Sequence, residues 1–151
     1  MTEPTLILRT LNDASCASAL EPLFKKSTGP PLPFLMNLLA QPSCHAWSCW
    51  RGDLVVGAVW FQCVEGVAEV LDLRVLASCR RQGYGKQLLE ASLQALAPVE
   101  RVDLEVRASN EAALGLYSGL GFRATGRRSD YYVTLEGRED AILMTWAPEQ
   151  V

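Results

Sequence analysis

The second half of the chain shows two hydrophobic periods that distinguish helices from a strand. Across residues 87–97 apolar side chains recur every three or four positions, the spacing of an amphipathic helix. Across residues 102–106 every second residue is apolar, as in a strand with one buried face. Asn110 stands where an N-cap would open a helix over residues 111–120, and Gly121 follows as a stop signal. The pattern predicts helix, strand and helix in succession.

Apolar runs predict strands in much of the remaining chain. They cover residues 5–10, 46–50, 54–64, 67–75, 122–128 and 141–146. Short turns at residues 51–53 and 65–66 join the three middle strands into an antiparallel meander.

Two further helices are predicted near the start of the chain. Asp13 can cap a helix that runs toward Lys26, and Pro22 should kink or break it because proline has no backbone N–H. The proline-rich segment 29–33 predicts an irregular loop, after which a helix restarts over residues 34–40.

The order of these elements is β-α-α-β-β-β-α-β-α-β-β. It predicts an α/β (mixed α+β) fold, with a central mixed, mostly antiparallel sheet flanked by helices on both faces. The 151 residues contain no repeat, low-complexity segment or linker, so we expect a single domain over residues 1–151.

Composition and charge narrow the class of protein. No apolar run approaches the ~20 residues that span a membrane, and the polar, acidic residues 1–4 do not resemble a signal peptide. A net charge of −3 argues against nonspecific binding of nucleic acid and permits a cationic substrate. Five cysteines without a Cys-x-x-Cys pair, and one histidine, His45, disfavour a zinc site. We expect a cytoplasmic protein with free thiols and no metal.

Glycines and cations meet between the strand that ends at Val75 and the helix that begins at Gln87. The segment 80–86 holds Gly83, Gly85 and three cationic side chains. The first N–H groups of a helix lack intrahelical partners and the helix dipole is positive there, while glycines let a phosphate approach several N–H groups. We interpret the segment as a diphosphate-binding turn; an ordinary glycine turn with solvated charges is the alternative.

Two common phosphate loops do not fit this segment. A Walker loop is excluded by Arg80 at its first glycine and Gln87 at its hydroxyl position, and a dinucleotide fingerprint by Leu88 at its third glycine. Arg-x-x-Gly-x-Gly entering a helix in mid-chain instead resembles the coenzyme-A loop of the GNAT superfamily of N-acetyltransferases. Cys79, beside this loop, is either a reactive thiol or, as we favour, an ordinary buried or surface cysteine.

Motifs downstream make the resemblance more specific. Residues 104–110, 116–117, 120–122 and 137–141 are similar to one GNAT branch, the bacterial N-acetyltransferases that modify the N-terminal alanine of a small-subunit ribosomal protein. The similarity covers residues 67–145. It implies the GNAT fold, acetyl-CoA as co-substrate and a protein N-terminal segment as acceptor, without direct contact to nucleic acid or membrane.

The resemblance also assigns residues to acetyl-CoA. The main chain of one strand segment would pair with the pantetheine arm and polarise the thioester oxygen, and the glycine turn would hold the diphosphate. The residues concerned are Leu73, Arg74 and Val75 in the strand, and Arg81, Gln82, Gly83, Tyr84, Gly85 and Lys86 in the turn. Asn110 would add a hydrogen bond to coenzyme A beside its role as an N-cap.

Glu105 matches the proton acceptor of the resembling enzymes. By alternation it points away from the apolar face of its strand, together with Asp103. An attacking amine must be neutral, and a free α-amine has a pKa of about 8, so a partly desolvated carboxylate is suited to take its proton directly or through water. A solvated carboxylate without a catalytic role is the alternative.

Tyr117 matches the residue that donates a proton to the departing CoA thiolate in the family. A free thiol has a pKa of about 8.5, so a tyrosine hydroxyl can serve as the acid. The tyrosine lies on the apolar face of its helix with Leu116 and Leu120, which a purely structural role would also explain.

The acceptor side departs from the family pattern. Arg74 replaces a small residue and Asp72 a neutral amide; the two either pair with each other or change the charge of the acceptor pocket. A different proline-rich stretch, 30–34, follows the first helix. Tyr131 and Tyr132 are retained and are expected to bind substrate.

The sequence predicts a cytoplasmic, acetyl-CoA-dependent N-acetyltransferase that works by direct transfer in a ternary complex. Its expected acceptor is the N-terminal alanine of a ribosomal protein. One alternative is acetylation of lysine side chains or of a small-molecule amine. Another, of a different class, is a non-catalytic acyl-CoA-binding module, which the presence of both Glu105 and Tyr117 disfavours.

Overall fold

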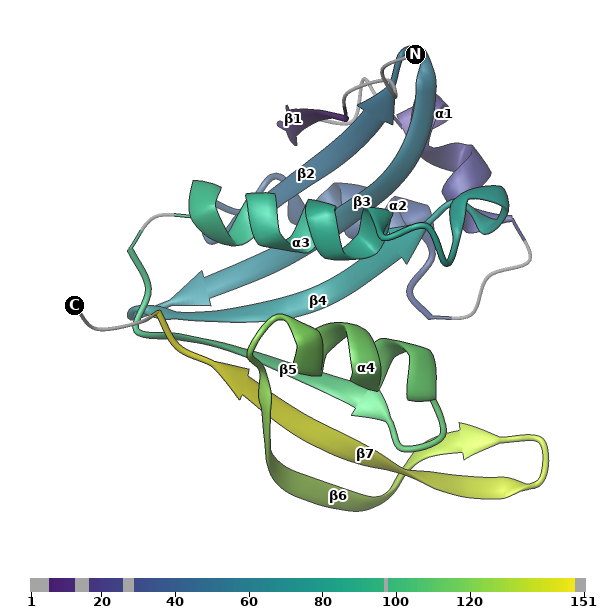
Figure 1. Ribbon diagram of the computed structural model, residues 1–151, viewed down its shortest axis with the longest axis vertical. Coiled ribbons are helices and arrows are strands. Elements are labelled where there is room, and N and C mark those ends of the chain that lie inside the picture. The colour runs from purple at the N-terminus through teal and green to yellow at the C-terminus, as the bar shows by residue number, and fades with distance from the viewer. Residues whose placement is uncertain (1–5, 13–16, 26–28, 97, 149–151) are drawn as a thin grey trace. The chain divides into compact units, whose positions relative to one another are not determined.

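The computed structural model describes residues 6–12, 17–25, 29–96 and 98–148 (Figure 1). The expected helix cap Asp13 and helix end Lys26 lie outside these ranges. The strands are β1 (Ile7–Leu11), β2 (Cys44–Arg51), β3 (Leu54–Val64), β4 (Val67–Val75), β5 (Arg101–Arg107), β6 (Arg123–Thr134) and β7 (Gly137–Trp146). The α-helices are α1 (Ala17–Leu20), α2 (Leu32–Leu38), α3 (Tyr84–Ala95) and α4 (Glu111–Gly119), with 3-10 turns η2 (Glu21–Phe24) and η3 (Ala77–Cys79).

The strands form one seven-stranded sheet in the order β1-β2-β3-β4-β5-β7-β6. The pairs β1–β2, β2–β3, β5–β7 and β6–β7 are antiparallel, and β4–β5 is parallel. The predicted mixed, mostly antiparallel sheet is therefore confirmed. The chain divides into two compact units, residues 1–63 with 71–97 and residues 64–70 with 98–151, and β4 contributes to both.

In the first unit the core lies where β1, β2 and β3 meet α1, η2 and α2. Its buried side chains are Leu11, Leu20, Leu23, Leu32, Leu35, Met36, Ala46, Trp50, Val55, Ala58 and Trp60. Phe24 packs edge-on against Trp60, with ring centroids 6.1 Å apart. Burying this apolar surface stabilises the unit by ~25 cal/mol per Å² removed from water.

Prolines set the helix boundaries of the first unit. The predicted break at Pro22 is confirmed, because α1 ends at Leu20 and a 3-10 turn that contains Pro22 follows. The predicted end of the loop at residue 33 was wrong, because α2 already begins at Leu32 and includes Pro33 in its first turn. A proline is tolerated there because the N–H groups of the first turn have no intrahelical acceptor.

In the second unit the alternation predicted for β5 is confirmed. Val102, Leu104 and Val106 are buried, while Asp103 and Glu105 on the other face are partly exposed. β6 and β7 both extend beyond their predicted ranges and meet at a two-residue turn. Their added residues are mostly exposed and polar, so they carry no hydrophobic period and depend on backbone pairing with each other.

The end of α4 shows how one glycine fixes the chain direction after a helix. Gly121 has φ +100°, its N–H donates to Ser118 O and the Phe122 N–H donates to Tyr117 O. These are the two hydrogen bonds of a Schellman motif, and the accompanying apolar contact joins the Phe122 and Tyr117 rings at 5.7 Å. The predicted stop at Gly121 is confirmed.

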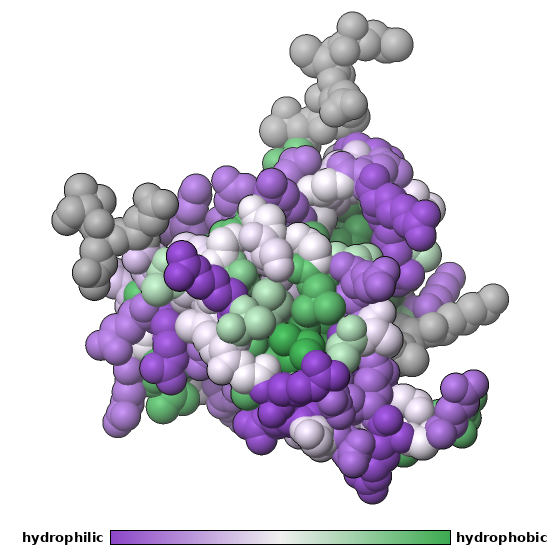
Figure 2. All heavy atoms as spheres, turned by 60° about the horizontal axis from the view of Figure 1, so that its bottom comes forward, coloured by the Kyte–Doolittle hydropathy of each residue, from purple (hydrophilic) through white to green (hydrophobic). Residues whose placement is uncertain are grey.

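Polar side chains cover most of the face shown in Figure 2, with apolar side chains in smaller areas between them. Within the described ranges, no helix is long and apolar enough to cross a membrane.

Candidate functional site

The N-terminus of α3 lies open for a ligand. Gly83 is the N-cap residue, at φ +82°, and no side chain accepts a hydrogen bond there. A Cβ built on Gly83 would meet no protein atom within 4 Å, so the space above it is free. The helix starts at Tyr84, three residues earlier than its apolar period predicted, so the first-turn N–H groups belong to the glycine segment itself.

Side chains before α3 brace this segment. Arg80 Nε donates to the Val75 carbonyl and Gln82 Nε2 to the Ser78 carbonyl, each at 3.3 Å. Arg81 adopts a left-handed conformation (φ 64°), which is uncommon for a residue with a Cβ and is often found at functional sites. Arg81 and Lys86 are exposed, so positive charge flanks the open helix end. Anions bind readily at such an end.

Arg51, at the end of β2, contacts the first residue of α3 and was missed from the sequence. Its Nη1 donates to the Tyr84 hydroxyl at 2.9 Å, and its guanidinium lies 5.8 Å from the centre of the Tyr84 ring. The two residues are 33 positions apart in the sequence, so no local pattern indicates the contact. It fixes Tyr84 and adds another cation beside the start of α3.

The segment Leu73–Val75 lies at the end of β4, with Leu73 and Val75 half-buried and Arg74 buried. Arg74 pairs with Asp72 at 2.6 Å, which confirms the first of the two expectations for these charges. Burial raises the pKa of Asp72, and the hydrogen bond and charge of Arg74 offset part of that rise. Removing one partner of a buried pair costs ~3–5 kcal/mol, because the other charge is left without compensation.

Glu105 lies half-buried on β5, in the second unit. Its Oε1 is 3.1 Å from Arg128 Nε on β6. The Tyr131 hydroxyl donates a hydrogen bond to the same carboxylate, and this hydrogen bond raises the pKa of Tyr131. The structure therefore brings together two predicted site residues, Glu105 and Tyr131, and adds Arg128, which no sequence period indicated.

Further carboxylates surround Glu105. Glu69 on β4 is the register partner of Asp103 on β5. Burial raises the pKa of Glu69, and the neighbouring charges of Glu105 and Asp103 raise it further. Asp103 accepts a hydrogen bond from the Thr145 hydroxyl at 2.9 Å. Asp103 also pairs with Arg101 at 3.1 Å, so two of these three carboxylates have an arginine partner.

Tyr132 stacks beneath a cation in the same unit. The Arg107 guanidinium lies 4.4 Å from its ring centre, and the Tyr131 ring meets it edge-on at 5.0 Å. Burial raises the pKa of Tyr132, and the charge of Glu105 adds to the rise. Both tyrosines expected to bind substrate are thus oriented by contacts within β5 and β6.

The two predicted residues of α4 have clear structural partners. Asn110 Oδ1 accepts a hydrogen bond from the Ala113 N–H at 3.1 Å, so its predicted role as an N-cap is confirmed. Tyr117 lies half-buried on the helix, against Phe122. Phe122 in turn lies 6.4 Å from the Trp146 ring of β7, so the aromatic row anchors α4 to the sheet of its own unit.

The four cysteines within the described ranges are all free thiols. Cys49 and Cys79 are buried free thiols, and Cys44 and Cys63 are partly buried free thiols. Burial raises the pKa of Cys49 to about 11 and also raises the pKa of Cys44 and of Cys63. In the part of the chain that the structure covers, no three histidine, cysteine, aspartate or glutamate side chains are grouped to hold a metal ion.

The open, cation-flanked start of α3 suits an anionic ligand, and Glu105 is a half-buried carboxylate on β5. The model of the acetyltransferase (GNAT) family matches residues 13–122, and the chain belongs to this family. The match includes residues of both units.

Particular relatives are also similar. The chain is 45% identical over 85 residues to the [ribosomal protein bS18]-alanine N-acetyltransferase of Escherichia coli K12. The match covers 55% of this chain and 57% of that enzyme, a little over half of each. The crystal structure of the ribosomal-protein-S18-alanine N-acetyltransferase from E. coli superimposes with a TM-score of 0.86 and 27% identity, over 97% of this chain and 96% of that one. Arabidopsis thaliana NAA60 in complex with acetyl-CoA shares the fold, with a TM-score of 0.78 and 19% identity over 95% and 98% of the chains.

Proposed function

We propose that this protein transfers the acetyl group of acetyl-CoA to a protein N-terminal amine, the N-terminal alanine of a ribosomal protein of the bS18 type. The structural observation that carries the proposal is the open start of α3, which offers main-chain donors and flanking cations to a diphosphate. The acceptor is supported by the activity for which the similar E. coli proteins are named. The proposed place of action is the cytoplasm.

The residues of the first unit suit acetyl-CoA. The first-turn N–H groups from Gly83 to Lys86, with Arg81 and Lys86, would hold the diphosphate, and Gln82, Tyr84 and Gly85 complete the turn. The main chain of Leu73, Arg74 and Val75 would hold the pantetheine arm and donate toward the thioester oxygen. Asn110, in the second unit, would add its side-chain amide as a donor. Acetyl-CoA supplies the activated acetyl group.

The residues of the second unit would move the protons. The amine nitrogen attacks the thioester carbonyl, a C–N bond forms and the C–S bond breaks. Glu105 takes the proton that the amine must lose, directly or through water, and Tyr117 gives a proton to the thiolate of coenzyme A. Tyr131 and Arg128 orient the Glu105 carboxylate through the contacts described above. Tyr131 and Tyr132 would also border the acceptor chain.

The test compares acceptors under saturating acetyl-CoA, with the acetylated product located by mass spectrometry. The panel holds an alanine-started peptide of ribosomal protein bS18, the same peptide with a blocked N-terminus and an added lysine, and spermidine. We expect the free alanine peptide to have the highest kcat/KM and the acetyl group on its α-nitrogen. Higher kcat/KM for the blocked peptide or for spermidine would move the function to lysine or small amines. Acetyl-CoA binding without turnover on any acceptor would identify a binding module.

A further inference from the structure

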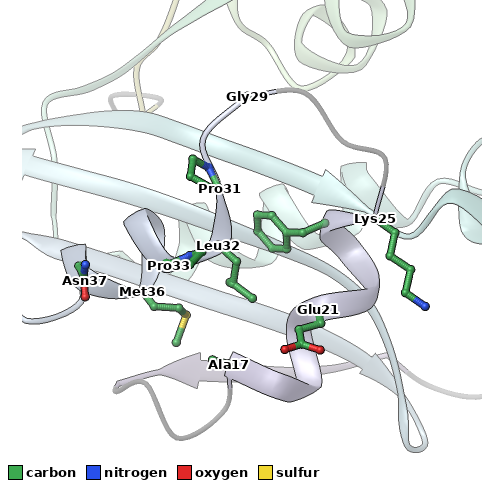
Figure 3. A pocket seen from close by; sticks show the side chains of 10 residues that line it. Ala17, Glu21, Lys25, Gly29, Pro31, Leu32, Pro33, Met36 and Asn37 are labelled. Carbon is green, nitrogen blue, oxygen red and sulfur yellow. The ribbon is translucent and has the colours of Figure 1, made fainter.

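Arg51, the last residue of β2, lies on the sheet face that α3 covers in the first unit, and α2 covers the other face (Figure 1). Trp50 belongs to the core on the α2 side, where η2 and α2 also border a pocket (Figure 3). Cys49 lies on the α3 side, because a Cβ built on its register partner Gly57 would be 3.5 Å from Cys49 Sγ and 3.2 Å from Leu88 of α3. Side chains of a strand alternate between its faces, so Arg51 shares the face of Cys49 and points to α3.

The side chain of Arg51 holds the first residue of α3 by two interactions. Its Nη1 donates to the Tyr84 hydroxyl at 2.9 Å, and its guanidinium carbon lies 5.8 Å from the centre of the tyrosine ring. A hydrogen bond from a charged donor is stronger than one between neutral groups. Both side chains are half-buried, so water can replace either partner. Loss of the contact therefore leaves no buried polar group unsatisfied, and variants that lack it should fold.

The first turn of α3 has little local stabilisation of its own. Gly83, at the N-cap position, has no side chain to accept from the first N–H groups, and no acidic residue stands in the first turn. Gly85 brings the conformational freedom of a glycine, which is lost when the turn forms. Lys86 places a positive charge near the positive end of the helix dipole. These features suit an anion, but they weaken the turn in the ligand-free protein, and helix ends fray.

We propose that Arg51 is a positioning residue for acetyl-CoA: through the Tyr84 hydroxyl it holds the first turn of α3 in its helical form before the ligand arrives. The N–H groups from Gly83 to Lys86 then already point together, and binding of the diphosphate does not have to order them. The Gln87 N–H, which donates to the Gly83 carbonyl at 3.1 Å, closes this turn and reports whether it is formed. The inference rests on the proposed function, in which this turn holds the diphosphate of acetyl-CoA.

Amide hydrogen exchange of the ligand-free protein tests the contact directly. In Arg51→Met and in Tyr84→Phe, which keeps the ring and removes the hydroxyl, the Gln87 amide should exchange at least ~5-fold faster than in the wild type. The Leu96 amide, which donates to the Ser92 carbonyl at 2.9 Å at the other end of α3, should keep its rate. Faster exchange of both amides would mean a general loss of stability and would overturn the inference. So would an unchanged exchange rate of Gln87.

Calorimetric titration with acetyl-CoA tests the consequence for binding. The dissociation constant should rise ~5-fold in each single variant and no further in the double variant, because both substitutions remove the same contact. A weaker affinity in Arg51→Met together with an unchanged affinity in Tyr84→Phe would show that Arg51 acts through its charge alone, and that result would overturn the inference. Additive losses in the double variant would overturn it as well, since they would mean that the two side chains act independently.

A matched control is Arg9→Met, which removes another arginine and another cation–π contact of the same unit. The guanidinium carbon of Arg9 lies 4.7 Å from the Trp50 ring centre. This variant should keep both the exchange rate of Gln87 and the affinity for acetyl-CoA; a change in both equal to that in Arg51→Met would overturn the inference. If the wild-type protein itself does not bind acetyl-CoA, the proposed function fails instead, and the exchange of Gln87 still tests the contact of Arg51 with Tyr84.

Discussion

Glu105 and Tyr117 have different partners, although both lie half-buried in the second unit. The Glu105 carboxylate contacts a guanidinium on β6 and the hydroxyl of Tyr131. The Tyr117 ring packs against an aromatic side chain that the Schellman motif places beside it. The proposed base, Glu105, therefore lies among charged and hydrogen-bonding groups, and the ring of the proposed acid, Tyr117, packs against Phe122.

Glu105→Gln tests the base. The substitution keeps shape and most hydrogen bonding but removes the proton acceptor, so kcat should fall on the order of 10²-fold near neutral pH while acetyl-CoA affinity is retained. The loss should shrink at high pH, where more of the amine is already neutral. The measurement is a pH–rate profile of both proteins at saturating acetyl-CoA. Equal rates at every pH would make Glu105 a structural carboxylate.

Tyr117→Phe tests the acid. The ring and its contact with Phe122 remain, and only the hydroxyl is lost. We expect kcat to fall on the order of 10²-fold and acetyl-CoA binding to change little. Phe122→Leu, which disturbs the same aromatic row while keeping the hydroxyl, is the control for packing. A lower Tm with normal kcat in Tyr117→Phe would leave this tyrosine with a structural role alone.

At the scale of elements, the start of α3 and the hairpin of β6 and β7 both differ from their predicted limits. The helix period began at Gln87, because Tyr84, Gly85 and Lys86 show no apolar spacing, yet they complete the first turn. The hairpin residues beyond Arg128 are mostly polar and exposed, and β6 carries register shifts that break any alternation. Periodicity finds elements that bury a face, and these two ends bury little.

Gly83→Ala tests the open helix end. A methyl group there meets no protein atom within 4 Å, but it occupies the space above the N–H groups and strains a backbone at φ +82°. We expect acetyl-CoA affinity to fall at least ~10-fold, or ~1.4 kcal/mol, by calorimetric titration. Gly115→Ala adds the same methyl in α4, where nothing lies within 4 Å and φ is not positive, and should leave affinity unchanged. Equal affinities of the wild type and both variants for acetyl-CoA would show that this turn does not bind it.

The base of the hairpin should respond to acid. The Ser109 N–H donates to Glu139 at 2.7 Å and the Asp130 N–H to Asp140 at 2.9 Å. These hydrogen bonds, joined by Arg107 and Arg127, lower the pKa of Glu139 below its ordinary 4.5 and of Asp140 below its ordinary 3.8. A lowered pKa in the folded state means that the stabilisation is present above the ordinary pKa and is lost as pH falls through the lowered one.

The measurement is the pH dependence of the Ser109 and Asp130 amide shifts by NMR. Both should titrate with midpoints below the ordinary carboxyl values. Glu139→Gln should abolish the titration of the Ser109 amide and keep that of Asp130. Midpoints at the ordinary values would mean that the carboxylates do not hold these amides.

At the scale of the whole molecule, the element order and the mixed sheet were predictable, because buried faces leave periods of 2 and 3.6 in the sequence. The glycine turn was predictable as the entry to a helix, while the roles assigned to Glu105 and Tyr117 from motifs stay predictions. The contacts of Arg51 and Arg128 were not predictable, because their partners lie 33 and 23 positions away in the sequence. A single arginine gives no local sign of a distant partner. For Asp72 and Arg74 the sequence left two possibilities, an ion pair or a changed charge in the acceptor pocket, and the structure shows the ion pair.

Sharing of β4 by the two units predicts that they unfold together. Acetyl-CoA at ~100 times its dissociation constant should stabilise the native state by ~2.7 kcal/mol. If unfolding is cooperative, amide hydrogen exchange should slow in β5 and β7 as well as in α3. Slower exchange restricted to the first unit would show that the two units unfold separately, against the single domain expected over residues 1–151.

The state of the cysteines affects how turnover can be followed. Reagents for free thiols react with the thiolate form, and the partly buried Cys44 and Cys63 hold their protons more tightly than an ordinary cysteine. Cys49 and Cys79 are shielded by burial. These four thiols should therefore react slowly at neutral pH, so a colorimetric thiol reagent can report each coenzyme A set free, and alkylation of these four beforehand is unnecessary.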